Sequence, residues 1–142
     1  RLTRAANTAR AARTLALLAG AAVPLLDALA IAAQVVPNLP MRESLRRAAF
    51  KVREGSGFAR ALAESKQFPP IALRLIASGE RSGELPRMLE EAAAQQQREL
   101  DRALGLLSAT LGPAVILLVG AMVLFIVLAI LMPIFDLNQM VK

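Results

Sequence analysis

The sequence contains no cysteine, histidine, tryptophan or tyrosine among its 142 residues. Without cysteine the chain forms no disulfides and offers no thiolate ligand or nucleophile. Without histidine it lacks the commonest metal ligand and general base. A serine nucleophile would also need a base, and no Ser-x-x-Lys pair at helical spacing is present. Cysteine- and histidine-based catalysis is therefore excluded, and we expect that the protein is not an enzyme.

Paired carboxylates are the remaining candidates for catalysis or for binding a hard cation. The local pairs are Glu80 with Glu84 and Glu90 with Glu91. Each pair lies in a helix turn or on an exposed helix face among arginines, which favours solvated or salt-bridged carboxylates. A carboxylate-bound metal enzyme is therefore only a third hypothesis, and we expect no cofactor and no metal.

One long apolar stretch dominates the C-terminal third of the sequence. No charged residue lies between Arg102 and Asp136, and residues 113–132 form a run of 20 uncharged, mostly apolar residues. As an α-helix this run is about 30 Å long, enough to cross the core of a bilayer. The alternative is a buried helix, but so short a chain has too small a core to surround a helix that is apolar on every side. We predict a transmembrane helix, with Pro113 in its first turn and Pro133 ending it.

Basic residues are distributed unevenly about this stretch. Sixteen of the 17 Lys and Arg residues precede it, with Arg98 and Arg102 close to its entrance, and only Lys142 follows it. By the positive-inside tendency, the N-terminal block is cytoplasmic and the tail lies across the membrane. The block also carries the whole net charge of +6, which suits anionic lipid, nucleic acid or acidic protein as a partner.

The N-terminal block shows helical periodicity interrupted by short turns rich in Pro and Gly. No segment alternates apolar and polar residues for long enough to indicate a strand. Six helices are expected, and the sixth meets no strong breaker before the membrane, so the two are predicted to be nearly continuous. The predicted limits are about 7–20, 24–36, 41–54, 58–66, 70–79, and from 85 to beyond 107.

Capping residues mark the ends of these helices. Asn7 is predicted to cap the first helix after a loose basic leader, and Ser56 is available to cap the fourth. Gly55 suits the left-handed position that ends the third helix. Gly79 and Gly83, which flank Glu80, are predicted to form a tight structural turn between the fifth and sixth helices.

The fold class expected from this pattern is all-α: an antiparallel six-helix cytoplasmic bundle followed by one C-terminal transmembrane helix. The predicted domains are the bundle at 1–108, the membrane helix at 109–133 and a short tail at 134–142. Because Arg1 is not an initiator methionine, we expect the chain to be part of a longer protein.

Two sets of residues are candidate contact surfaces. The third helix carries a basic face, for which a solvated surface, an acidic protein and inner-leaflet lipid are alternatives. Its arginines have no interleaved aromatic residues, so nucleic acid is not an expected partner. The apolar stretch carries small residues suited to packing against other membrane helices. The candidates are Arg42, Arg46, Arg47, Lys51 and Glu80 for partner binding, and Gly105, Ala109, Gly112, Gly120 and Ala121 for membrane packing.

The order of four motifs resembles that of the type II secretion F/PilC family of polytopic inner-membrane platform proteins. The motifs are Leu15-Ala-Leu-Leu18 with Val23-Pro-Leu-Leu-Asp-Ala-Leu29, Phe68-Pro-Pro70, Gly79-Glu-Arg-Ser-Gly-Glu-Leu85, and Ala129-Ile-Leu-Met-Pro-Ile-Phe-Asp-Leu-Asn-Gln139. The resemblance covers nearly the whole chain. Two positions depart from the family pattern, since Ala22 and Gly112 stand where relatives often have glycine and glutamate, respectively.

The resemblance implies that this chain is the C-terminal half of such a protein, with its second cytoplasmic domain and last transmembrane helix. It implies a bacterial inner-membrane location with the C-terminus in the periplasm. The partners it implies are a cytoplasmic secretion ATPase, other inner-membrane platform subunits, pseudopilins or pilins, membrane lipid and further copies of the protein.

The leading hypothesis is therefore a non-enzymatic assembly platform of a type II secretion or type IV pilus machine, which couples the ATPase to pseudopilin or pilin assembly. Glu80 and its turn are candidate structural or docking elements in this hypothesis. A membrane-anchored helical adaptor that binds anionic lipid or nucleic acid is the alternative, with affinity that falls steeply as salt rises.

Overall fold

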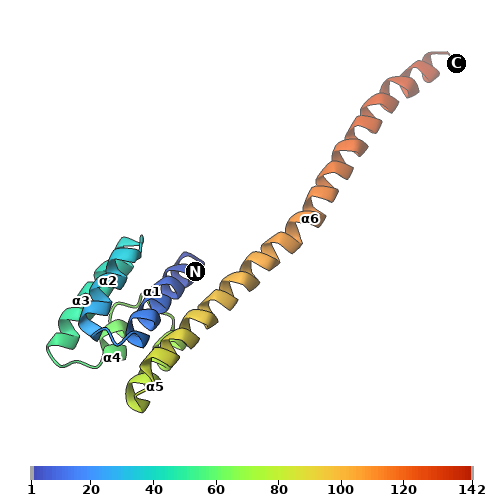
Figure 1. Cartoon of the computed structure of the whole chain (residues 1–142). Coiled ribbons are helices and arrows are strands. Elements are labelled where there is room, and N and C mark those ends of the chain that lie inside the picture. The colour runs from blue at the N-terminus through green and yellow to red at the C-terminus, as the bar shows by residue number, and fades with distance from the viewer. Residues whose placement is uncertain (1, 142) are drawn as a thin grey trace. The chain divides into compact units, whose positions relative to one another are not determined.

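The computed structural model describes residues 2–141, and within that range it contains six α-helices and no strand (Figure 1). The expected all-α fold is thereby confirmed. The predicted roles of Arg1 in a basic leader and of Lys142 in the tail concern residues outside the described range. The helices are α1 (Leu2–Gly20), α2 (Leu25–Val35), α3 (Leu39–Arg53), α4 (Phe58–Ala63), α5 (Pro70–Ser82) and α6 (Leu85–Met140).

The chain divides into two compact units, Arg1–Ala103 and Leu104–Lys142. The first unit contains α1 to α5 and the beginning of α6, and the second contains the remainder of α6. The division falls close to residue 108, where the sequence places the end of the bundle. The limits at 108 and 133 stay predictions.

Within the first unit, each of the first four helices packs against the next one along the chain. The predicted inward faces of α2 and α4 are confirmed, because Leu29, Val36, Phe58 and Leu62 are almost wholly buried. In α6, Gln96 is buried as the predicted seam requires, but Leu107 at the end of that seam is exposed. The apolar core of the first unit therefore draws on all six helices, and on α6 only near its beginning.

The predicted start of the first helix is wrong. α1 begins at Leu2, and Asn7 lies inside it, with Nδ2 donating a 2.7 Å hydrogen bond to the carbonyl of Thr3. The Arg4 guanidinium donates to the carbonyls of Gln67 and Phe68 at 2.6 and 2.8 Å. These bonds hold the first turn of α1 against the loop before α5. The residues predicted to form a loose leader are therefore helical. They are held by a contact with a distant segment, which a local capping motif cannot reveal.

Two helix ends share the same hydrogen-bonding pattern. After α1, the N–H of Val23 bonds to Leu18 O, and after α3 the N–H of Ser56 bonds to Lys51 O. In each turn one residue has a positive φ, +60° at Ala22 and +96° at Gly55. The pattern is the Schellman motif, which favours glycine at that position. The left-handed conformation predicted for Gly55 is confirmed, and Ala22 adopts a conformation better suited to glycine.

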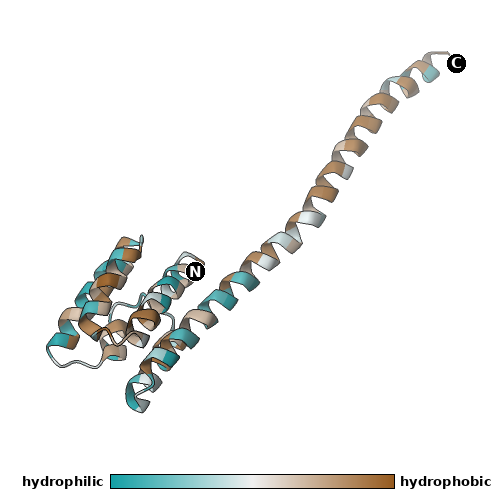
Figure 2. Ribbon diagram, viewed as in Figure 1, coloured by the Kyte–Doolittle hydropathy of each residue, from teal (hydrophilic) through white to brown (hydrophobic). Residues whose placement is uncertain are grey.

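The C-terminal helix departs from the prediction at both prolines. α6 is one helix from Leu85 to Met140, with Pro113 and Pro133 inside it. Pro113 is therefore not in a first turn, and Pro133 does not end the helix. The predicted continuity between the sixth helix and the apolar stretch is confirmed. Figure 2 shows polar residues on the early turns of α6 and predominantly apolar residues on its later turns.

Candidate docking surface and membrane segment

Glu80 on α5 caps the short helix α4. Its Oε1 accepts a 2.7 Å hydrogen bond from the N–H of Phe58, and its Oε2 accepts a 3.2 Å bond from the N–H of Ala59. These two N–H groups lie in the first turn of α4, where no intrahelical acceptor exists. Gly57, the N-cap residue, provides no side chain for this purpose. Ser56, the predicted cap, is therefore replaced by a carboxylate from another helix.

The two glycines near Glu80, Gly79 and Gly83, have different structural roles. Gly79 lies inside α5 and is buried, so its predicted place in a turn is wrong. A Cβ at Gly79 would lie 2.7 Å from Cβ of Met88 and 2.9 Å from Cα of Leu85, too close for any side chain. Gly83 follows α5 with a φ of +74°. Gly79 thus allows α5 and the start of α6 to approach closely, and Gly83 makes the reversal between them.

The four basic candidates on α3 have different environments. The Arg42 guanidinium donates hydrogen bonds of 3.2 and 3.1 Å to the carbonyl of Val36, just beyond the end of α2. Arg46 forms a 3.0 Å ion pair with Glu43 on the same helix. Lys51 forms an ion pair with Glu64, just after α4. Arg42 therefore has a structural contact with the end of α2, whereas Arg46 and Lys51 form ion pairs and Arg47 is exposed.

Arg47 and Lys51 line a small notch between α3 and the end of α4. Its volume is about 160 Å³, and its lining residues are Ser44, Arg47, Lys51, Ala61, Glu64 and Ser65. Arg46 does not line it. The structure thus brings Arg47 and Lys51 to one concave site and leaves Arg46 outside it. Glu80 is engaged at the start of α4 and also lies outside it.

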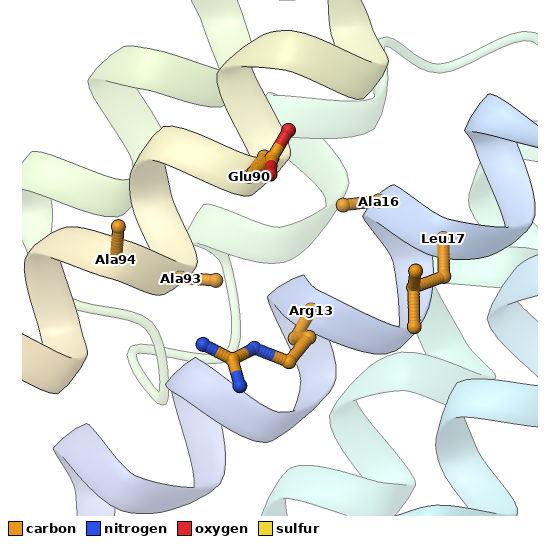
Figure 3. Close-up of a pocket in the computed structure, with 6 residues that line it drawn as sticks. All are labelled: Arg13, Ala16, Leu17, Glu90, Ala93 and Ala94. Carbon is orange, nitrogen blue, oxygen red and sulfur yellow. The ribbon is translucent and has the colours of Figure 1, made fainter.

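A second hollow runs between α1 and the first turns of α6. It has a volume of about 280 Å³, and Figure 3 shows the three lining residues that each helix contributes. Arg13 lies on the α1 wall and Glu90 on the α6 wall, with Ala93 and Ala94 beside Glu90. The hollow therefore has small side chains along α6 and charges of both signs.

Most of the carboxylates considered for metal binding make other contacts. Glu84 forms a 3.0 Å ion pair with Arg87, and Glu91 forms a 2.8 Å ion pair with Arg98. Within residues 2–141 no three Asp or Glu side chains gather into a group suited to a metal ion. Glu80 serves as the helix cap described above. Glu80 therefore has a structural role, Glu84 and Glu91 form exposed ion pairs of a kind that contributes little stability, and Glu90 lines the hollow between α1 and α6.

The second unit contains the candidate membrane segment. α6 is long and apolar enough to cross a membrane, and the most apolar window of this helix has a mean hydropathy of 3.3 with none of it buried in the protein. The predicted packing residues all lie on this helix and are exposed, and a Cβ at any of its three glycines would meet no neighbouring atom. They are Gly105, Ala109, Gly112, Gly120 and Ala121. Their packing role stays a prediction.

Sequence reasoning missed the features that depend on contacts between distant segments. The position of Ser44 in the notch follows from how α3 meets α4, and no local motif marks it. The target of Glu80 lies 22 residues away. Of these features, only the capping role of Glu80 has a sign in the sequence. The residue before α4 is a glycine, which has no side chain to cap the helix, so α4 needs an acceptor from another segment.

The comparisons with known proteins agree with the resemblance noted in the sequence. The family model described as "Type II secretion system (T2SS), protein F" matches residues 11–133. The chain is 50% identical over 141 residues to the type II secretion system protein F of Pseudomonas aeruginosa, covering 99% of this chain and 35% of that protein. It is 46% identical over 142 residues to the protein of the same name from Aeromonas hydrophila, and the match covers 100% of this chain and 37% of that protein.

A type IV pilus protein is also similar. The type 4 fimbrial assembly protein PilC of Pseudomonas putida is 38% identical over 136 residues, which cover 96% of this chain and 34% of PilC. The chain thus spans about a third of the length of these relatives, consistent with the C-terminal half that the resemblance implied. Because the family model covers most of the chain and its motifs occur in the family order, the chain belongs to the type II secretion system protein F family.

Proposed function

We propose that this chain is the membrane-anchored, C-terminal part of an assembly platform in a type II secretion or type IV pilus machine. The family supports a platform role, and the names of its members refer to secretion and pilus assembly. In this proposal the bundle lies in the cytoplasm, residues 113–132 cross the inner membrane and the C-terminus is periplasmic. The uneven distribution of basic residues supports that orientation.

The proposed mechanism is mechanical coupling. A cytoplasmic ATPase would act on the bundle, and α6 would carry the displacement to pilin-like helices in the membrane. The observation that carries this proposal is the run of α6 from Leu85, whose early turns join the core of the bundle, through the apolar segment to Met140. A helix resists bending and extension because each turn is hydrogen-bonded to the next. Pro113 removes one of these bonds, which makes it the natural place for α6 to bend.

Each set of candidate residues has a place in this proposal. Arg46, Arg47 and Lys51 on α3 form the cytoplasmic contact surface, and Arg42 supports it through the bond to Val36. Glu80 positions α4, and therefore the α3–α4 surface, and does not itself contact a partner. Gly105, Ala109, Gly112, Gly120 and Ala121 provide the membrane surface, because small residues allow close approach of another helix. The span then acts through packing.

Site-directed cross-linking in membranes tests the proposal. A photo-reactive amino acid is placed at Arg47 or at Gly120 of the full-length protein, and at Arg74 on α5 as a surface control. We expect the Arg47 site to capture the ATPase or a cytoplasmic part of another platform subunit, the Gly120 site to capture a pilin-like helix, and the Arg74 site to capture neither. Capture of lipid alone at both test sites would contradict the proposal and favour the lipid-binding adaptor.

A further inference from the structure

The notch between α3 and α4 contains a buried hydroxyl group that has no hydrogen-bond partner among residues 2–141. Ser44 is 1% exposed, and its Oγ is buried without a partner, although Ser44 lines the notch. A serine inside a helix usually bonds to the carbonyl four residues earlier or to solvent. A buried polar atom that does neither is unfavourable unless a water molecule or a ligand satisfies it.

The two cations of the notch are available to the same ligand. Arg47 is exposed and forms no ion pair within the described residues. Lys51 is paired with Glu64, but their side chains are 39% and 49% exposed. Ion pairs this exposed contribute little stability, so an incoming anion can exchange with Glu64 at small cost. Ser44, Arg47 and Lys51 follow at intervals of three and four residues, which places them on one side of α3.

The size of the notch limits what can occupy it. Its volume of about 160 Å³ is below the roughly 300–1,000 Å³ of typical small-molecule sites. A single acidic side chain is small enough to enter such a space.

We propose that this notch is a specific receptor site for one Glu or Asp side chain of an acidic partner protein. The partner carboxylate takes the place of Glu64 beside Lys51 and accepts a hydrogen bond from Arg47, and the movement of Glu64 uncovers the Ser44 hydroxyl, which then donates to the same carboxylate. Glu64 thereby acts as an internal competitor that occupies the cation until the partner arrives. This inference rests on the proposed function for the presence of a partner protein, and it names the chemistry of the contact.

Binding of a fluorescein-labelled ten-residue polyglutamate peptide to the chain in detergent micelles tests the site. Arg47→Gln should raise the Kd about tenfold, since a charge-assisted hydrogen bond is lost. Ser44→Ala should raise it about threefold without changing the net charge. Glu64→Gln should lower it about threefold, because the competitor is removed. The unfolding temperature of Ser44→Ala should be unchanged or higher, since it removes an unpartnered buried hydroxyl.

The neighbouring ion pair on α3 provides matched controls. Arg46 and Glu43 lie on the same helix, form an ion pair of similar exposure and do not line the notch. Arg46→Gln and Glu43→Gln make the same charge changes as Arg47→Gln and Glu64→Gln. Each should change the Kd less than twofold. The proposal would be overturned if Arg46→Gln and Glu43→Gln changed the Kd as much as Arg47→Gln and Glu64→Gln do, or if Ser44→Ala left the Kd unchanged. Either result would indicate diffuse electrostatic attraction.

The outcomes separate this inference from the proposed function. If the notch variants behave as expected but cross-linking from Gly120, which lies outside the notch, captures no pilin-like helix, the site stands and the platform role fails. If cross-linking captures the ATPase or a platform subunit while the notch variants bind the peptide like the unaltered chain, the platform role stands and the notch is not the contact.

Discussion

The two units of this chain differ in how far their apolar side chains are buried. In residues 1–103 many large apolar side chains are buried in a core shared by successive helices, and Leu29, Leu45 and Leu62 have no exposed surface. In residues 104–141 every side chain is exposed, including the whole apolar run. The first unit therefore draws its stability from its own core, whereas the second must obtain burial from lipid or from another chain.

Because of this difference, the two units should also differ in how strongly the effect of a substitution depends on its position. In the first unit, individual contacts fix the geometry, for example the bonds from Glu80 to the start of α4 and the close approach at Gly79. In the second, the helix satisfies its own backbone, and the requirement on its side chains is overall apolarity. The folding of the first unit should therefore depend on the site of a substitution, and the membrane insertion of the second unit should depend mainly on charge.

The largest expected effect is loss of core packing in the first unit. Leu29→Ala should lower the free energy of unfolding by about 2–5 kcal/mol, because it removes buried methyl groups and leaves a cavity. The matched change Leu118→Ala in the apolar run should leave that free energy within about 0.5 kcal/mol of the unaltered chain. Thermal and urea unfolding of the chain in detergent, followed by circular dichroism, measures both. Equal effects would contradict the contrast between the units.

A charge placed in the apolar run should have the next largest effect. Val123→Arg should oppose membrane integration by about 2.5–3.5 kcal/mol, the cost of a central arginine on insertion scales. Val123→Leu is the control and should integrate normally. The fraction of the chain that resists alkaline extraction from membranes reports integration. Full integration of Val123→Arg would show that this run is not in contact with lipid.

Loss of the α4 cap should have a smaller effect. Glu80→Ala should destabilise the first unit by about 1–2 kcal/mol, since two N–H groups lose a shared carboxylate acceptor. Glu80→Gln keeps one acceptor oxygen and should cost less. Glu90→Ala, which removes an exposed carboxylate from α6, serves as the comparison and should have little effect. Urea unfolding distinguishes the three, and equal stability of Glu80→Ala and Glu90→Ala would refute the capping role.

The smallest expected effect is a gain in stability. Ala22→Gly should stabilise the first unit by about 1 kcal/mol, because it relieves a left-handed conformation that is unfavourable for alanine. Gly55→Ala makes the reverse change in the equivalent turn after α3. It should destabilise by a similar amount, since a Cβ there meets open space and only the backbone is strained. Shifts of the same sign in the two variants would contradict this interpretation.

The sequence predicted the parts of the structure that depend on local pattern. Periodicity identified the buried faces of α2 and α4, and the spacing of α6 placed Gln96 inward, although it is polar. Gly55 was assigned its left-handed turn because glycine is the residue such a turn favours. The apolar run was evident from its length and its lack of charge.

The parts that could not be predicted depend on which distant segments meet. Asn7 has the chemistry of a helix cap, yet the contact of Arg4 with the loop before α5 extends α1 beyond it. Gly79 suggested a turn, but it is needed because Met88 packs against it. The α3 surface was predicted as a uniform basic face. Only the packing of α3 on α4 separates Arg47 and Lys51 from Arg46.

The most direct test of the central claim is the orientation of the chain in the membrane. Because this chain has no cysteine, single cysteines at Ser78 on α5 and at Asn138 near the end of α6 can be labelled uniquely, provided that the rest of the full-length protein is made cysteine-free. A membrane-impermeant maleimide is added to intact spheroplasts. We predict labelling of the Asn138 site at once and of the Ser78 site only after lysis. Labelling of both sites before lysis, or of neither, would contradict a cytoplasmic bundle anchored by a membrane-crossing α6.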